Sequence, residues 1–145
     1  AGRKDMALAS LLSGMALANA GLGAVHGIAA PLGGMFAAPH GAVCAALLPH
    51  VVETNVRALR ERAPDSPSLA RYKEAAALLG APPDDLAGWL QTLVDDFGLP
   101  RLGAFGVGEQ HLEELARKAA RASSMRANPI ELSEQELRRL VRAAL

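Results

Sequence analysis

The chain has 145 residues, of which 50% are hydrophobic but only 3% are Phe, Trp or Tyr. Fifteen Lys and Arg balance fifteen Asp and Glu, so the formal net charge is zero. The apolar content excludes extended disorder, and the lack of a basic excess argues against nucleic acid as a partner. The single cysteine, Cys44, excludes an internal disulfide and fits a reducing compartment, so we expect a cytoplasmic location.

Charged residues are absent from a long stretch near the N-terminus. Residues 6–52 contain no Asp, Glu, Lys or Arg, and such a stretch is long enough to span a membrane. It is interrupted, however, by Asn19, His26, Pro31, Gly33, Gly34, Pro39, His40 and Pro49. Each interruption would expose polar groups to lipid. We therefore predict no membrane span and no signal peptide, and we expect the stretch to form buried central helices.

The first half of the chain predicts three helices separated by Gly and Pro. Residues 6–20 are apolar on nearly every side, which is typical of a helix surrounded by other helices. A short helix over residues 25–30 is expected to end at the Pro and Gly residues that follow it. Pro39 is well placed to begin the next helix, which is expected to kink at Pro49 and to reach Arg62.

The second half of the chain predicts four amphipathic helices with recognisable ends. The expected ranges are 67–79, 84–97, 109–122 and 134–144, with a loop over 99–108. Gly80 and Gly98 are expected to end the first two helices. Ser133 and Glu136 have the Ser-x-x-Glu spacing of a capping box before the last one. No strand is needed, so we predict an all-α fold with a single helical domain over residues 1–145.

His26 and His40 are the residues of the uncharged stretch that offer chemistry. In one straight helix they would lie about 21 Å apart, but the Gly and Pro residues between them allow the chain to fold back. Two imidazoles brought together in this way would suit a zinc or iron ion. The alternative is a pair of neutral core histidines. Their spacing alone favours this alternative, because it forms no specific motif and metal sites usually take three or four ligands from protein.

A long segment of the sequence resembles a known family. Residues 23–41, GAVHGIAAPLGGMFAAPHG, and LLPH at residues 47–50 are similar to the C-terminal signature of the iron-containing alcohol dehydrogenases. Residues 6–10, 99–100 and 123–129 are also similar to that family, so the resemblance covers the whole chain. It implies a dehydroquinate synthase-like domain, an orthogonal bundle of several helices, and it raises the metal hypothesis above its alternative.

The resemblance also implies an NAD(P)-dependent reaction, in which Fe²⁺ or Zn²⁺ polarises an alcohol oxygen while hydride passes to or from nicotinamide. His26 and His40 match the family's two C-terminal metal ligands. The family's other two ligands are an Asp and a His four residues apart, and they lie upstream together with the nucleotide-binding domain. In this sequence no Asp is followed four residues later by His, and no dinucleotide fingerprint occurs in a strand-turn-helix context. We therefore expect the C-terminal part of a larger homo-oligomeric enzyme that acts on a small alcohol, aldehyde or ketone and is inactive without the remainder.

Other positions carry weaker hypotheses. Ala30 stands where many family members have a second histidine close to nicotinamide and substrate. We therefore assign no catalytic residue and name no particular substrate. Phe36 and Cys44 are candidates for the wall of the substrate pocket, with ordinary packing as the alternative. His50 is interpreted as a helix-kink residue and His111 as a surface residue. The alternative function for the chain is a non-catalytic helical interaction module with core histidines, which would expose an apolar face and self-associate.

Overall fold

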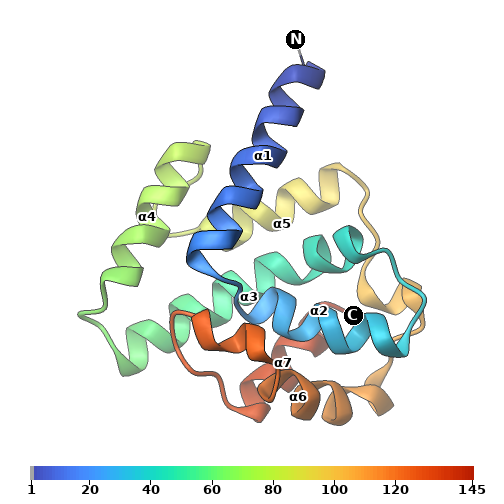
Figure 1. Cartoon of the computed structure of the whole chain (residues 1–145). Coiled ribbons are helices and arrows are strands. Elements are labelled where there is room, and N and C mark those ends of the chain that lie inside the picture. The colour runs from blue at the N-terminus through green and yellow to red at the C-terminus, as the bar shows by residue number, and fades with distance from the viewer. Residues whose placement is uncertain (1) are drawn as a thin grey trace.

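A computed structural model describes residues 2–145, in which there are seven α-helices and no strand (Figure 1). The helices are α1 (Gly2–Ala20), α2 (Ala24–Met35), α3 (His40–Arg62), α4 (Pro67–Leu79), α5 (Leu86–Asp96), α6 (Leu112–Ala120) and α7 (Glu134–Ala143). Short 3-10 helices occupy the later connections: η1 (Leu102–Phe105), η2 (Glu109–His111) and η3 (Ser123–Ala127). The predicted all-α fold is confirmed.

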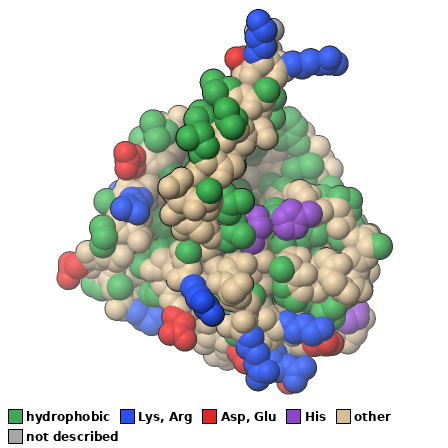
Figure 2. All heavy atoms as spheres, viewed as in Figure 1, with side chains coloured by type: hydrophobic (Ala, Val, Ile, Leu, Met, Phe, Trp, Pro, Cys, Tyr) green, Lys and Arg blue, Asp and Glu red, His purple; other side chains and the backbone are tan. Residues whose placement is uncertain are grey.

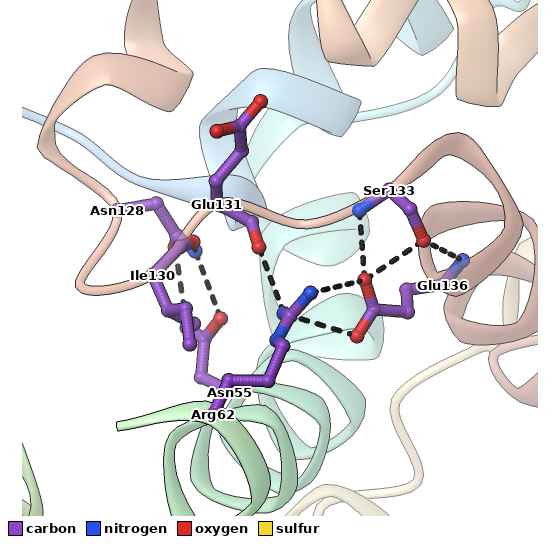
Figure 3. Close-up of polar contacts among 7 residues, drawn as sticks. All are labelled: Asn55, Arg62, Asn128, Ile130, Glu131, Ser133 and Glu136. Carbon is purple, nitrogen blue, oxygen red and sulfur yellow. Dashed lines mark hydrogen bonds and ion pairs between the residues drawn. The ribbon is translucent and has the colours of Figure 1, made fainter.

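Several helix ends follow from capping residues that the sequence already shows. Ser66 precedes α4 and accepts a hydrogen bond from the Ser68 backbone, and Gly80 ends that helix with a left-handed φ of 73°. Ser133 makes the predicted capping box of α7. Its backbone N–H donates to Glu136 Oε2 at 2.7 Å, and its Oγ accepts from the Glu136 N–H at 3.2 Å (Figure 3). These reciprocal bonds satisfy backbone donors that every helix start leaves free.

The main core lies between α2, α3, α6 and α7. Helix α2 packs against both α3 and α6, and α6 packs against α7. The largest fully buried side chains of this core include Ile28, Leu32, Leu47, Leu115 and Leu137. A second, smaller cluster joins α3 to α4 and α5 through Val52, Ala76, Ala81 and Leu86. Helices α2 and α3, which carry the two candidate histidines, are therefore held by the main core.

Helix α1 is not covered by other helices in the described chain, so the expectation that residues 6–20 lie among neighbours is wrong here. No residue of α1 is buried, and Figure 1 shows the helix projecting away from the rest. Its exposed large apolar side chains are Met6, Leu8, Leu11, Leu12, Met15 and Leu17. An apolar composition indicates that a helix has a surface to bury, but it does not identify the element that buries it.

Two prolines lie inside helices instead of ending them. Helix α2 continues past Pro31 to Met35, so the expected end at residue 30 is wrong. A proline removes one backbone donor, but Ile28 and Leu32 on either side of Pro31 are fully buried, and this packing offsets the loss. Helix α3 likewise continues past Pro49 to Arg62, as predicted. Within residues 2–145 no single helix is long and apolar enough to cross a membrane; α1 and α2 reach that length only as a pair bent by 101°.

Candidate metal centre

The structure places His26 and His40 side by side on two different helices. His26 lies in the first turn of α2, and His40 is the first residue of α3. Their ring centroids are 5.4 Å apart, and the ring planes are inclined by 47°. Two imidazoles that share a tetrahedral ion, with nitrogen-to-metal distances of roughly 2.0–2.1 Å, have centroids roughly 5 Å apart. The observed separation therefore suits a single shared metal ion.

The connection over residues 36–39 brings the two histidines together. Phe36 follows α2 in extended conformation, and Pro39 precedes α3 with a φ of −61° and a ψ of 124°. Because these residues are not helical, they end α2 and let α3 start in a new direction. Helix α3 then packs beside α2 through buried apolar side chains such as Ile28 and Val43. The histidines consequently meet at one edge of the α2 and α3 pair.

The electrostatics around His26 favour the uncharged imidazole. Burial lowers the pKa of His26 below its ordinary value of 6.5, and the neighbouring charge of His40 lowers this pKa further. His26 is half-buried, whereas His40 is exposed. Because a metal ion binds the neutral imidazole, the environment keeps His26 in the form that binds.

Cys44 also belongs to this cluster. It lies one turn after His40 on α3, and its Sγ is 3.4 Å from His40 Nε2. One donor atom from each of His26, His40 and Cys44 falls within 4.8 Å of the other two. Burial raises the pKa of the half-buried Cys44 thiol, so the thiol keeps its proton at neutral pH unless an ion binds it.

A cleft of about 590 Å³ opens beside the cluster. Its walls come from the base of α1, the start of α2, the middle of α3 and the segment around Asn128, and they include both His26 and Cys44. Most of the lining is apolar, with Leu48 and Val51 as examples. Figure 2 shows histidine side chains at the surface beside α1, next to apolar ones. The cluster thus borders a mainly apolar space of a size that small organic molecules fill.

The remaining predicted site residues lie apart from the cleft. Phe36 is not among the residues that line it; its ring packs edge-on against His111, with centroids 4.9 Å apart. Ala30 is exposed one turn after His26 on α2 and brings no titratable group to that turn. His50 is half-buried farther along α3, where burial lowers its pKa. Of the two weaker candidates for the pocket wall, the structure therefore brings only Cys44 to the histidines.

Sequence reasoning missed a partly buried amide network that supports the cleft (Figure 3). Asn128 Oδ1 accepts from the Ala24 N–H at 3.0 Å, and Asn128 Nδ2 donates to Asn55 Oδ1 at 2.8 Å and to the Ile130 carbonyl at 2.7 Å. Asn55 Nδ2 donates to Asn128 Oδ1 at 3.2 Å and to the Tyr72 hydroxyl at 3.1 Å. An uncharged polar residue among the apolar positions of α3 was the available signal for Asn55. No comparable signal marks Asn128.

The network fixes the start of α2 relative to α3. Ala24 is the first residue of α2, and its N–H is one of the donors that a helix start leaves free. Gly23, the residue before it, has no side chain that could accept this bond, so Asn128 takes the capping role from 104 residues away. His26 lies two residues beyond Ala24, so the amide network holds the helix turn that carries a candidate ligand.

Comparison with known proteins agrees with this architecture. The sequence model described as Fe-containing alcohol dehydrogenase family, C-terminal, matches residues 1–145. A 1,3-propanediol dehydrogenase from Klebsiella pneumoniae is 38% identical over 144 residues, which are 98% of this chain and 37% of that protein. A lactaldehyde reductase from Escherichia coli K12 is 33% identical over 142 residues, which are 97% of this chain and 37% of that protein.

A solved structure shows the same fold. The crystal structure of a 1,3-propanediol oxidoreductase superposes with a TM-score of 0.85 at 33% sequence identity, and the match covers 97% of this chain and 37% of the other. The chain thus spans little more than a third of the length of the relatives it matches. From the match over its whole length and the shared helical fold, we conclude that this chain belongs to the Fe-containing alcohol dehydrogenase family and corresponds to its C-terminal domain.

Proposed function

We propose that this chain is part of a metal-dependent, NAD(P)-linked alcohol dehydrogenase, and that His26 and His40 hold its divalent metal ion. The observation that carries the proposal is the pair of imidazoles, 5.4 Å apart on α2 and α3. Both Fe²⁺ and Zn²⁺ accept imidazole nitrogen as a ligand. The names of the relatives, a propanediol dehydrogenase and a lactaldehyde reductase, support a small alcohol, aldehyde or ketone as the substrate.

The residues of this chain have distinct roles in the proposed reaction. His26 and His40 would hold a divalent ion, which would supply Lewis-acid polarisation of the substrate oxygen. The neutral His26 and the exposed His40 offer nitrogen lone pairs, and the amide network around Asn128 holds the helix turn that carries His26. Leu48 and Val51 give one side of the cleft an apolar surface. Ala30 offers no proton carrier, so protons would pass through water or through cofactor hydroxyls.

The activity is proposed for a protein that includes more than these residues. The chain covers about 37% of its relatives, and it contains neither the expected Asp and His ligand pair nor a dinucleotide fingerprint. We therefore expect the 145-residue chain to show no NAD(P)-linked turnover alone. A longer chain that supplies those parts is the form in which to assay turnover.

The test is the metal content of the 145-residue chain, measured by elemental mass spectrometry on protein purified without a histidine tag. We expect bound iron or zinc after reconstitution, and we expect its loss in His26→Ala and in His40→Ala. His50→Ala is the matched control, because His50 lies on the same helix as His40 but outside the cluster.

The outcomes are distinct. Metal that disappears in both cluster variants but persists in His50→Ala supports the shared site. Equal metal content in all four proteins would show that the ion binds elsewhere and would contradict the proposed ligands. Circular dichroism of each variant checks that the helices remain formed, so that the loss of metal is not a loss of fold.

A second function is favoured by one observation, the exposed apolar side chains of α1. A helical interaction module would bind no metal and would associate through such a surface. Its histidines are not core residues, however, because His40 is exposed and His26 is only half-buried. Light scattering of the metal-free chain, together with the metal analysis above, separates the two functions. Oligomers without any metal uptake would favour the interaction module.

A further inference from the structure

We propose that Cys44 is a third metal ligand, so that His26, His40 and Cys44 form a set of two nitrogens and one sulfur on this chain. This inference rests on the proposed function, because it needs the ion that His26 and His40 hold. The resemblance to the family assigns histidine and aspartate ligands only, and Cys44 entered the sequence analysis as no more than a candidate for the pocket wall. The assignment comes from the positions of the three side chains.

The distances match a coordination site. In a tetrahedral zinc site, with sulfur at roughly 2.3 Å and nitrogen at roughly 2.0–2.1 Å from the ion, the two ligand atoms lie roughly 3.5 Å apart. Cys44 Sγ is 3.4 Å from His40 Nε2. The two histidine rings have the separation of co-ligands as well, at 5.4 Å between centroids. Both distances, from Cys44 to His40 and from His26 to His40, are therefore those expected of ligands around one ion.

The helices explain why three donors converge. His40 and Cys44 are four residues apart on α3, and such residues share a face of a helix. His26 approaches this face from α2, which packs beside α3 in the main core. The adjoining positions Val43 and Leu47 are buried, so α3 is unable to rotate this face away from His26. The set is thus built by the same packing that forms the core.

Without an ion, the contact between Cys44 and His40 is that of a thiol beside an imidazole nitrogen within hydrogen-bonding distance. When an ion binds, the S–H bond breaks, a sulfur–metal bond forms, and the proton leaves to the buffer. The imidazole nitrogens contribute lone pairs and release no proton if they are already neutral. Binding through Cys44 therefore releases about one more proton than binding through the histidines alone.

The sulfur ligand determines which metal the site prefers. Thiolate is a soft ligand that suits zinc, whereas carboxylate and water suit harder ions such as Mg²⁺ and Mn²⁺. A site that includes Cys44 is therefore expected to prefer Zn²⁺ over Mn²⁺ more strongly than a site of two histidines. Cys44 also lines the cleft with His26, so an ion held there would face the cleft.

The experiment uses Co²⁺ as a spectroscopic substitute for Zn²⁺ in the 145-residue chain. A thiolate bound to Co²⁺ produces a sulfur-to-metal charge-transfer band in the near ultraviolet, and histidine ligands produce none. We compare the original chain with Cys44→Ser and with His26→Ala, and we record proton release in weak buffer. Cys44→Ser is the matched variant, because it changes one atom and leaves the space filled.

The proposal expects the charge-transfer band in the original chain and its loss in Cys44→Ser, which should still bind Co²⁺ through the histidines with affinity reduced by about tenfold or more. Partners that only support a ligand already change metal affinity by about 10- to 100-fold, so the loss of a ligand should reach this range. Proton release should fall by about one per ion in the variant.

Two other results overturn the proposal, and they are distinguishable. If the original chain binds Co²⁺ without the charge-transfer band, and Cys44→Ser binds it equally well, Cys44 is not a ligand and the histidine pair stands. If the folded original chain binds no Co²⁺ at all, the Cys44 assignment fails together with the proposed histidine site. Circular dichroism of Cys44→Ser, compared with the original chain, excludes unfolding as the cause of a lost band.

Discussion

At the scale of single residues, the amide pair of Asn55 and Asn128 both caps the start of α2 and connects it to α3. Asn55 is only 2% exposed, and its amide oxygen and nitrogen are both hydrogen-bonded. A buried polar group that loses its partner incurs a desolvation cost larger than the net stability of an ordinary hydrogen bond. The two asparagines should therefore matter more to stability than the exposed ion pairs of this chain, which are worth about 0–1 kcal/mol each.

We predict that Asn128→Ala lowers the free energy of unfolding by about 2–3 kcal/mol, because it leaves the Asn55 amide oxygen and the Ala24 N–H without their partner. Urea denaturation followed by circular dichroism measures the change. Asn19→Ala is the matched control: Asn19 is exposed on α1, and its substitution should change the free energy by no more than about 0.5 kcal/mol. Equal effects of the two substitutions would show that the network adds no stability.

At the scale of elements, helix ends were predictable where the signal is local. The bounds of α4 agree with the prediction because Ser66 and Gly80 cap it from adjacent positions, and the start of α7 follows from its capping box. The exposure of α1 and the continuation of α2 past Pro31 depend on which other elements pack against them. A local sequence pattern carries no information about those elements. Likewise the two histidines stood out as polar residues in an apolar stretch, whereas Asn128 contacts α2 only through the fold.

The contrast between α1 and α6 gives a prediction for otherwise identical substitutions. Leu115→Ala in α6 should lower the free energy of unfolding by about 2–5 kcal/mol, since Leu115 is fully buried and its truncation leaves a cavity. Leu11→Ala in α1 should change it by no more than about 0.5 kcal/mol, because Leu11 is 62% exposed. Chemical denaturation of both variants tests this. A large loss in Leu11→Ala would mean that α1 is covered in solution, for example by a second copy.

At the scale of the whole molecule, the balanced composition conceals an uneven distribution of charge. Residues 6–52 carry histidine as their only titratable side chains besides Cys44, so histidines determine how that part responds to mild acid. His50 is the histidine of this group that lies outside the cluster of His26, His40 and Cys44. Burial lowers the pKa of His50, Glu53 raises it and Arg101 lowers it, and the net shift is downward from 6.5.

We predict that the metal-free chain loses stability as the pH falls below 6.5. A histidine with a lowered pKa in the folded state binds fewer protons there than in the unfolded state, so its contribution is present above 6.5 and is lost as the pH falls through the lowered value. Thermal unfolding between about pH 7 and pH 5 measures the effect. His50→Gln should reduce the slope of the melting temperature against pH without changing its sign, since the pKa of His26 is lowered as well. A slope of opposite sign would contradict the pKa shifts.

The hydrogen bond from Ala24 to Asn128 also constrains the order of events during synthesis. A ribosome releases residues in sequence order, and 104 residues separate this donor from its acceptor. Helix α2 can begin to form early, but its first turn stays uncapped until residue 128 has emerged. A nascent chain arrested before that point would therefore carry His26 on a first turn of α2 that still lacks this hydrogen bond.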